Sequence, residues 1–311
     1  MIPGWIGNLA LGPVRERERA GTRPAGFAGR RSSGRRPIPW PGGVALLIAA
    51  GLVGLAVVGP GWGASGSDSQ DLAGRLAPPV WGGGSGDHPL GTDGLGRDLL
   101  ARIAAGARTS LLVAVAATLG AGVIGVGLGV VAGISGGAAD RVIAWLADVQ
   151  LALPFVLVAI AAAATVGTGT WQVVVVLAVT GWVAYARVVR SSARSIRRAP
   201  YIEAATALGA SRGQVIARHV LPNLAAPVVA IGGQQLAGMI LYEAGLSYLG
   251  LGVPRESVSW GSLIADAGEA PASAWWLTVF PGVMLALAVL AANLLGDWWL
   301  RALTRREMGS G

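Results

Sequence analysis

Six apolar stretches constrain the fold of this chain more than any other feature. Several of them reach the roughly 20 residues that a helix needs to cross the hydrocarbon core of a bilayer. Charged residues make up only 13% of the chain and hydrophobic residues 53%. The sequence therefore predicts an all-α membrane protein with six transmembrane helices and no separate soluble domain. The stretches are Val44–Val58, Thr109–Ile134, Val142–Val166, Trp171–Tyr185, Leu224–Gly245 and Trp275–Leu295.

The segments between these stretches define the expected organisation. The arginine-rich start cannot bury enough apolar surface to fold, so it is expected to be a disordered tail. A cleaved signal peptide is the alternative for the first stretch, but its basic region is too long and residues 61–64 make a poor cleavage site. The expected parts are a tail at 1–40, a first transmembrane helix at 41–59, an external segment at 60–108, a five-helix core at 109–300 that includes a cytoplasmic loop at 187–223, and a tail at 301–311.

The distribution of arginine predicts the orientation. Cytoplasmic loops of membrane proteins carry an excess of basic residues. With the N-terminus inside, the inner segments hold 19 of the 24 arginines and the outer segments hold five. Both termini are therefore predicted to be cytoplasmic, in a multi-pass protein of the inner membrane. The net charge of +8 follows from this topology and gives no reason to expect nucleic acid as a partner.

Missing residue types exclude several kinds of chemistry. The chain has no cysteine, and its two histidines, His88 and His219, are far apart, so neither disulfides nor a metal site is predicted. It also has no lysine, and a standard phosphate-binding P-loop requires one. Any ATP and magnesium that drive this protein must therefore bind to another chain. No set of residues typical of an active site is present, so the chain is not expected to be an enzyme.

Two of the apolar stretches contain residues that can do more than span the bilayer. Gly125, Gly129 and Gly133 recur every four residues and predict a flat helix face for close packing, although glycine is common throughout this chain. In the third stretch Asp148 and Gln150 are polar, and Pro154 is expected to kink the helix. A carboxylate in a membrane helix needs a cavity or a partner. These residues are candidates for a substrate pathway, and a solvated helix end or an arginine partner explains Asp148 equally well.

The long inner segment between residues 187 and 223 predicts two short helices joined by an elbow. Pro200 suits the first turn of a helix, and Gly209 can end that helix. Ser211 and Gln214 have the spacing of a capping box, which starts a second helix. An interfacial anchor is the simpler interpretation. A rigid elbow is more than an anchor needs, and it is suited to passing force from a soluble motor into the membrane helices.

The same segment resembles the "EAA" loop of ABC importer permeases. The resemblance rests on Glu203-Ala204-Ala205, on Gly209 and on Leu221-Pro222. In that family the loop fits a groove on the ATPase subunit, which implies a coupling role for Glu203, Ala204, Ala205, Gly209, Ser211 and Arg212. His219 stands where the general pattern has an aliphatic residue, and the surrounding sequence is similar to the peptide and nickel branch.

Three further motifs resemble the C-type subunit of that branch, and together the similarity covers about residues 88–305. They are Leu90–Asp98 continuing through Gly106–Leu111, Tyr248–Pro254 leading into Ser259–Gly261, and Phe280–Gly282 followed by Asn293–Asp297. The resemblance implies the type I permease fold and a heterodimer with a second homologous permease. It also implies two ATPase subunits, an extracytoplasmic solute-binding protein and membrane lipid as partners. The implied substrates are di- or oligopeptides, with nickel complexes or glutathione as alternatives.

Aromatic and charged residues near the ends of the stretches have interpretations of their own. Trp260, Arg255, Glu256 and Asp266 are candidate contacts for a docking partner outside the membrane. Trp275 and Trp276 are expected in an aromatic belt at the outer interface, and Trp298 and Trp299 in one at the inner interface.

Two rival functions stay open on sequence grounds. An ion-driven secondary transporter would need ionisable residues near the membrane midplane, and such residues are sparse here. A membrane anchor or assembly factor would leave the elbow without a role.

Overall fold

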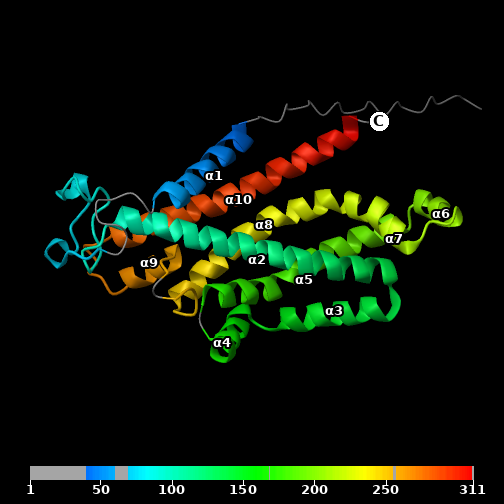
Figure 1. Ribbon diagram of the computed structural model, residues 1–311, viewed down its shortest axis with the longest axis horizontal. Coiled ribbons are helices and arrows are strands. Elements are labelled where there is room, and N and C mark those ends of the chain that lie inside the picture. The colour runs from blue at the N-terminus through cyan, green and yellow to red at the C-terminus, as the bar shows by residue number, and fades with distance from the viewer. Residues whose placement is uncertain (1–39, 60–68, 168, 255–256, 310–311) are drawn as a thin grey trace, which may run out of the picture. The chain divides into compact units, whose positions relative to one another are not determined.

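The computed structural model describes residues 40–59, 69–167, 169–254 and 257–309, and within these it is almost entirely helical (Figure 1). The predicted tail at 1–40 lies outside the described residues except for Trp40. The principal helices are α1 (Trp40–Val58), α2 (Leu99–Ser135), α3 (Gly137–Ala152), α4 (Phe155–Val166), α5 (Thr170–Arg197), α6 (Pro200–Ala207), α7 (Arg212–Val215), α8 (Leu221–Tyr248), α9 (Trp260–Ala267) and α10 (Trp276–Gly309). Short 3₁₀ turns occupy Leu72–Gly74 and Val80–Gly82, and a π-helical turn, η4, occupies Ile216–Val220.

All six predicted apolar stretches form helices. Four helical segments of the described chain are long and apolar enough to cross a membrane: α2, α5, the continuous run from Arg212 to Tyr248, and α10 up to Ala302. The pair α3 and α4 is a fifth candidate if it counts as one bent span. The apolar part of α1, Gly42–Val58, is shorter and extends about 26 Å at 1.5 Å per residue.

The third stretch is a broken helix rather than a straight one. α3 ends at Ala152, α4 begins at Phe155, and the two axes differ by 92°. Pro154 stands in the break. It prevents a continuous helix because it has no backbone N–H to donate to the preceding turn and because its ring clashes with that turn. Its carbonyl oxygen instead accepts a hydrogen bond from the amide of Leu157 at 3.0 Å and so begins α4.

Several helices extend beyond the predicted stretches. α2 begins at Leu99 rather than near Thr109, because the side chain of Asp98 caps it by accepting a hydrogen bond from the amide of Ala101 at 2.8 Å. α2 is therefore 37 residues long, or about 56 Å. α10 likewise continues to Gly309, through the segment expected to be a tail.

The bundle has two principal seams. α2 packs along α5, while α8 packs against both α10 and α2, and α1 lies on α10 (Figure 1). Gly233 of α8 and Gly296 of α10 allow a close approach of these two helices, since a Cβ atom added to Gly233 would lie 2.5 Å from the Cα atom of Gly296. The elbow helices α6 and α7 lie at one end of the bundle and α9 lies at the other.

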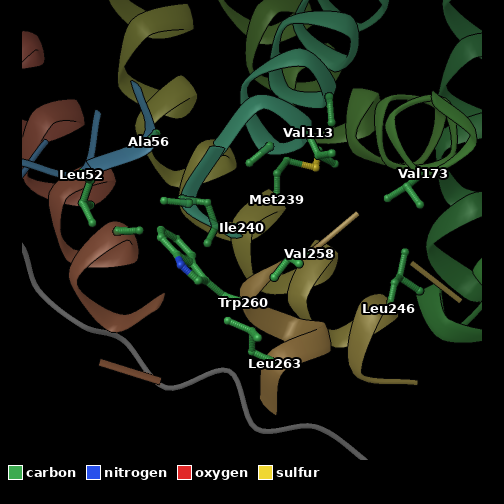
Figure 2. Close-up of a cluster of buried hydrophobic side chains, with 14 of the residues drawn as sticks. Leu52, Ala56, Val113, Val173, Met239, Ile240, Leu246, Val258, Trp260 and Leu263 are labelled. Atoms are coloured by element: carbon green, nitrogen blue, oxygen red, sulfur yellow. The ribbon is translucent and has the colours of Figure 1, made fainter. Parts of the chain in front are cut away.

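The largest hydrophobic cluster lies around Trp260, the first residue of α9. The indole is completely buried among side chains that include Ile240 of α8 and Leu263 of α9 (Figure 2). Its ring N–H donates a hydrogen bond to the carbonyl oxygen of Ile103 at 3.1 Å. The prediction that Trp260 lies on a docking rim is therefore wrong. Trp276 is also buried and donates to the carbonyl oxygen of Thr92 at 3.2 Å, so its assignment to an aromatic belt is wrong as well, whereas Trp275 is exposed.

Candidate functional site

The predicted elbow forms a compact structure between α5 and α8. We use the term elbow for residues 200–220, which comprise α6, the turn at 208–211, α7 and η4. Pro200 stands in the first turn of α6, where its fixed φ favours a helix and its missing N–H is not needed. Glu203 and Ala204 are exposed and Ala205 is half-buried. Ile202 is buried and faces the bundle.

Gly209 makes the bend. Its φ is +90°, and a Cβ atom added there would meet nothing within 4 Å, so the position requires glycine for backbone conformation rather than for space. The amide of Gly209 donates to the carbonyl oxygen of Thr206, and the amide of Ala210 donates to that of Ala205, both at 3.0 Å. These bonds satisfy the last carbonyl groups of α6 and hold the turn in one conformation.

The second arm begins with the capping box that the sequence predicts. The Ser211 hydroxyl accepts a hydrogen bond from the amide of Gln214 at 3.3 Å, and the Gln214 side chain accepts one from the amide of Ser211 at 2.8 Å. Arg212 starts α7 and is exposed. The chain then continues through η4 into α8 without a break, so the second arm of the elbow and α8 form one continuous helical segment from Arg212 to Tyr248.

Both arms of the elbow are seated on the membrane helices. Ile202 of α6 and Val215 of α7 are buried with Val220 in a separate hydrophobic cluster. The rest of that cluster comes from α2, α5 and α8, through Val130, Val189, Ala193 and Leu224. The elbow therefore packs directly on three long helices.

The outer face of α6 carries an apolar stripe that the sequence reading missed. Tyr201, Ala204 and Leu208 are spaced by three and four residues, so they lie on one side of the helix. All three are exposed, and Leu208 reaches 89% exposure at the tip of the bend. The Tyr201 ring packs against the His219 ring of η4, with ring centroids 5.9 Å apart. The spacing of these three residues is a sequence signal that could have indicated this stripe.

The three glycines of α2 lie against α5. A Cβ atom added to Gly125 would be 2.4 Å from the carbonyl oxygen of Trp182, one at Gly129 would be 2.7 Å from the Cβ atom of Val189, and one at Gly133 would be 2.7 Å from that of Ala193. Real Cβ atoms do not make contacts below 3.0 Å. The two helices can approach this closely because glycine stands at all three positions.

The candidate pathway residues do not form one cluster. Asp148 pairs with Arg187 of α5 at 2.7 Å in a cleft of about 410 Å³ between α3 and α5. Gln150 ties the same two helices together, since its amide donates to the carbonyl oxygen of Thr180 at 2.6 Å and its oxygen accepts from the Trp182 indole at 2.7 Å. Pro154 lies beyond them at the exposed break before α4.

The end of the bundle opposite the elbow has its own polar centre. Asp93 is buried and accepts hydrogen bonds from the amides of Leu95 and Arg97 and from the guanidinium groups of Arg97 and Arg102. Burial opposes ionisation of this carboxyl, but these donors and the Arg102 charge outweigh it and hold the pKa of Asp93 below its usual value of 3.8. Asp266 of α9 lies 3.5 Å from Arg102. Arg255 and Glu256 lie outside the described residues.

A second polar group at this end includes a carboxyl group of α8. Glu243 of α8 is completely buried, and its Oε1 atom accepts a hydrogen bond from the Ser247 hydroxyl at 2.7 Å. No group of three or more histidine, cysteine or acidic side chains able to hold a metal ion is present among the described residues.

Comparison with known proteins agrees with this architecture. The sequence model of the binding-protein-dependent transport system inner membrane components matches residues 125–308. The dipeptide transport system permease protein DppC of Alkalihalophilus pseudofirmus is 35% identical over 254 residues, 82% of each chain. The di/tripeptide transport system permease protein DppC of Pseudomonas aeruginosa is 38% identical over 71% of this chain and 74% of that protein. The glutathione transport system permease protein GsiD of Pectobacterium atrosepticum is 38% identical over 69% and 71%.

A solved structure shows the same fold. A chain of the inward-facing MetNI methionine ABC transporter superposes with a TM-score of 0.54 at 21% identity, covering 63% of this chain and 94% of that chain. This confirms the predicted all-α, type I permease fold. Taken with the sequence matches, it establishes that the chain belongs to the family of binding-protein-dependent transport system inner membrane components.

Proposed function

We propose that this chain is the permease subunit of an ATP-binding-cassette importer and carries di- or oligopeptides across the inner membrane. In this proposal both termini are cytoplasmic, and a second homologous permease completes the translocation path. Two partner ATPase subunits bind ATP and magnesium at the elbow end. A solute-binding protein delivers substrate at the α9 end. The family is one of membrane permeases rather than enzymes, and the relatives named for peptides support the choice of substrate.

The elbow is the observation that carries the proposal. Its exposed stripe of Tyr201, Ala204 and Leu208 offers an apolar surface to a partner, while its inner side is fixed to α2, α5 and α8. Burying a leucine side chain contributes about 1.5–3 kcal/mol, so Leu208 is the expected centre of the contact. Glu203 and Arg212 are exposed on either side of the bend and can make polar contacts around it.

Movement of the elbow would reach the bundle by two routes. α8 continues from η4 without a break, and α5 ends three residues before α6 begins. When ATP closes the ATPase pair, the elbows of the two permeases would be drawn together, and these helices would tilt between inward-facing and outward-facing arrangements. Interiors of packed helices do not deform continuously, so such a tilt is passed on as a rigid-body movement.

The substrate path is proposed to run beside α3 and α4. Asp148 and Arg187 supply both signs of charge at the cleft between α3 and α5, which suits the two charged ends of a short peptide. The helix break at Pro154, between α3 and α4, lies along the same proposed path. Gln150 would hold the wall of the path in position through its bonds to α5.

The test uses the complete transporter in proteoliposomes. Uptake of a labelled dipeptide should require both ATP and the solute-binding protein. The variant Leu208→Glu should weaken capture of the ATPase subunits by about 30-fold, as expected for a residue at the centre of an interface. The matched control is Leu72→Glu, because Leu72 is also well exposed but lies in the 3₁₀ turn outside the elbow. Normal capture by the Leu208 variant would contradict the docking role.

The same vesicles separate the alternative functions. Uptake driven by an ion gradient without ATP would indicate a secondary transporter. ATP-dependent uptake of glutathione or of a nickel complex, but not of dipeptides, would keep the permease assignment and change the substrate. The relative named for glutathione transport makes glutathione the first competitor to include.

A further inference from the structure

α8 connects the two ends of the bundle. It begins at Leu221, directly after the elbow, and ends at Tyr248 near α9 (Figure 1). Glu243 lies one and a half turns before that end and has no exposed surface. None of the ion pairs formed by the described residues includes Glu243. A buried carboxyl group without a cationic partner is costly, and packing alone would be served better by an apolar side chain.

Three hydroxyl groups surround this carboxyl group, and they come from three elements. Ser247 belongs to α8 itself and donates to the Oε1 atom at 2.7 Å. The hydroxyl groups of Ser110 in α2 and Ser259 at the start of α9 face the same carboxyl group. Its Oε2 atom has no hydrogen-bond partner among the described residues. Glu243 is therefore the common polar contact of α2, α8 and α9.

Each of these hydroxyl groups is also held by a backbone amide. Ser110 accepts from the amide of Trp260 at 3.2 Å, and Ser259 accepts from the amide of Ser262 at 3.2 Å. Ser247 accepts from the amide of Val253 at 3.4 Å. Because each oxygen already accepts an N–H, its own proton is available to another acceptor; Ser247 donates its proton to Glu243, and the hydroxyl groups of Ser110 and Ser259 lie beside the same carboxyl group.

The three elements around this group are in close contact. A Cβ atom added to Gly261 of α9 would lie 2.3 Å from the carbonyl oxygen of Ala244, and one added to Gly106 of α2 would lie 3.1 Å from the Trp260 ring. Figure 2 shows Trp260 in the middle of this contact. α9 therefore cannot shift on α8 without disturbing the Glu243 group.

We propose that Glu243 is a positioning residue that fastens α9 to α8, so that displacement of α8 by the elbow is passed to the opposite end of the molecule. Movement of α9 would change the shape of the cleft of about 470 Å³ beside it, which is lined by residues that include Arg102, Ser262 and Asp266. This inference rests on the proposed function, in which the elbow is driven by ATPase subunits. In this inference, movement of α9 changes the surface that contacts the solute-binding protein.

The absence of cysteine from the chain allows the test by paired spin labels in the complete transporter. One pair joins Ala265 of α9 to the exposed Leu290 of α10, and a second joins the exposed Ala217 of the elbow to Leu290. In the unaltered protein, trapping the ATP-bound state should change both distances. In Glu243→Leu the elbow distance should still change and the α9 distance should not. Stimulation of ATP hydrolysis by the loaded binding protein should fall about tenfold, as for loss of a typical coupling between sites.

The outcomes distinguish failure of the proposed function from failure of the role proposed for Glu243. An elbow distance that does not respond in the unaltered protein would refute the proposed function. An elbow distance that responds, together with a normal α9 change in Glu243→Leu, would overturn the role of Glu243. If Glu243→Leu does not assemble, Ser110→Ala and Glu243→Gln replace it. Ser110→Ala should reduce the change in the α9 distance. Glu243→Gln still accepts hydrogen bonds and should retain most of that change. Equal and normal changes of the α9 distance in both variants would overturn the proposal.

Discussion

Replacement of Gly125 by alanine provides a direct test of the seam between α2 and α5. The added Cβ atom would lie 2.4 Å from the carbonyl oxygen of Trp182 and 2.5 Å from the Cβ atom of Tyr185. A carbon normally approaches a carbonyl oxygen no closer than about 3.3 Å, so the helices would have to separate by about 0.9 Å. Both contacting atoms belong to the backbone or stand next to it, so no side chain can rotate away.

The expected cost follows from this geometry. Forcing an extra methyl group into a well-packed interior costs about 1–3 kcal/mol. Alanine also favours a helix over glycine by about 1 kcal/mol, and this gain offsets part of the cost. Gly127→Ala separates the two effects, because Gly127 is exposed in the same helix and a Cβ atom there meets nothing within 4 Å. The two variants should therefore differ in stability by about 1–3 kcal/mol.

The measurement is thermal unfolding in detergent, followed by tryptophan fluorescence, with both variants purified in the same way. Gly127→Ala should unfold at or above the temperature of the unaltered protein, and Gly125→Ala clearly below it. Equal unfolding temperatures would show that α2 and α5 do not approach at Gly125 as closely as described, and the reasoning about the seam would fail.

Three further predictions concern other parts of the molecule. Gly209→Val forces a branched residue into a left-handed conformation that costs about 1–2 kcal/mol. Dipeptide uptake should fall relative to ATP hydrolysis, while the control Gly213→Val, in a helical position with open space, keeps their ratio. Asp93→Asn removes the nearer charge partner of the buried Arg102 and leaves only Asp266 at 3.5 Å, so it should lower stability by about 3 kcal/mol, the lower end for a broken buried ion pair. Because the folded pKa of Asp93 is lowered, its contribution is present above pH 3.8 and is lost as pH falls below that value, so acid unfolding of the variant should lack this component. Gln150→Leu removes two hydrogen bonds between α3 and α5 and should lower the unfolding temperature by the equivalent of about 1–3 kcal/mol; an unchanged temperature would contradict the link.

The elbow could be predicted in detail because its causes are local. Pro200 at the start of α6, the positive φ of Gly209 and the capping box at Ser211 each depend only on residues a few positions away. The break at Pro154 is local in the same sense. The direction of that break was not predictable, since the 92° angle between α3 and α4 depends on how each helix packs.

The burial of single side chains could not be read from the sequence. Trp260 looks like a surface aromatic beside charged residues, but it is enclosed by α2 and α8, which are distant in the chain. Leu208 looks like an ordinary core residue of an apolar helix and is almost fully exposed. In both cases the burial of the side chain depends on which helix faces pack together, and the neighbouring sequence does not reveal this.

This limit has a physical cause that is specific to membrane helices. In a soluble helix the apolar stripe marks the face that packs inward. In lipid the outward face is apolar as well, so hydrophobicity does not distinguish the two. The inward face of this bundle is marked instead by small residues, as at Gly125, Gly233 and Gly296, and by polar groups that need partners, as at Gln150 and Glu243. A polar group that lipid would penalise can stay in a membrane helix only where it is satisfied by neighbours. Glu243 is buried where α2, α8 and α9 meet, and this position is the basis of the proposal that α8 and α9 are mechanically connected there.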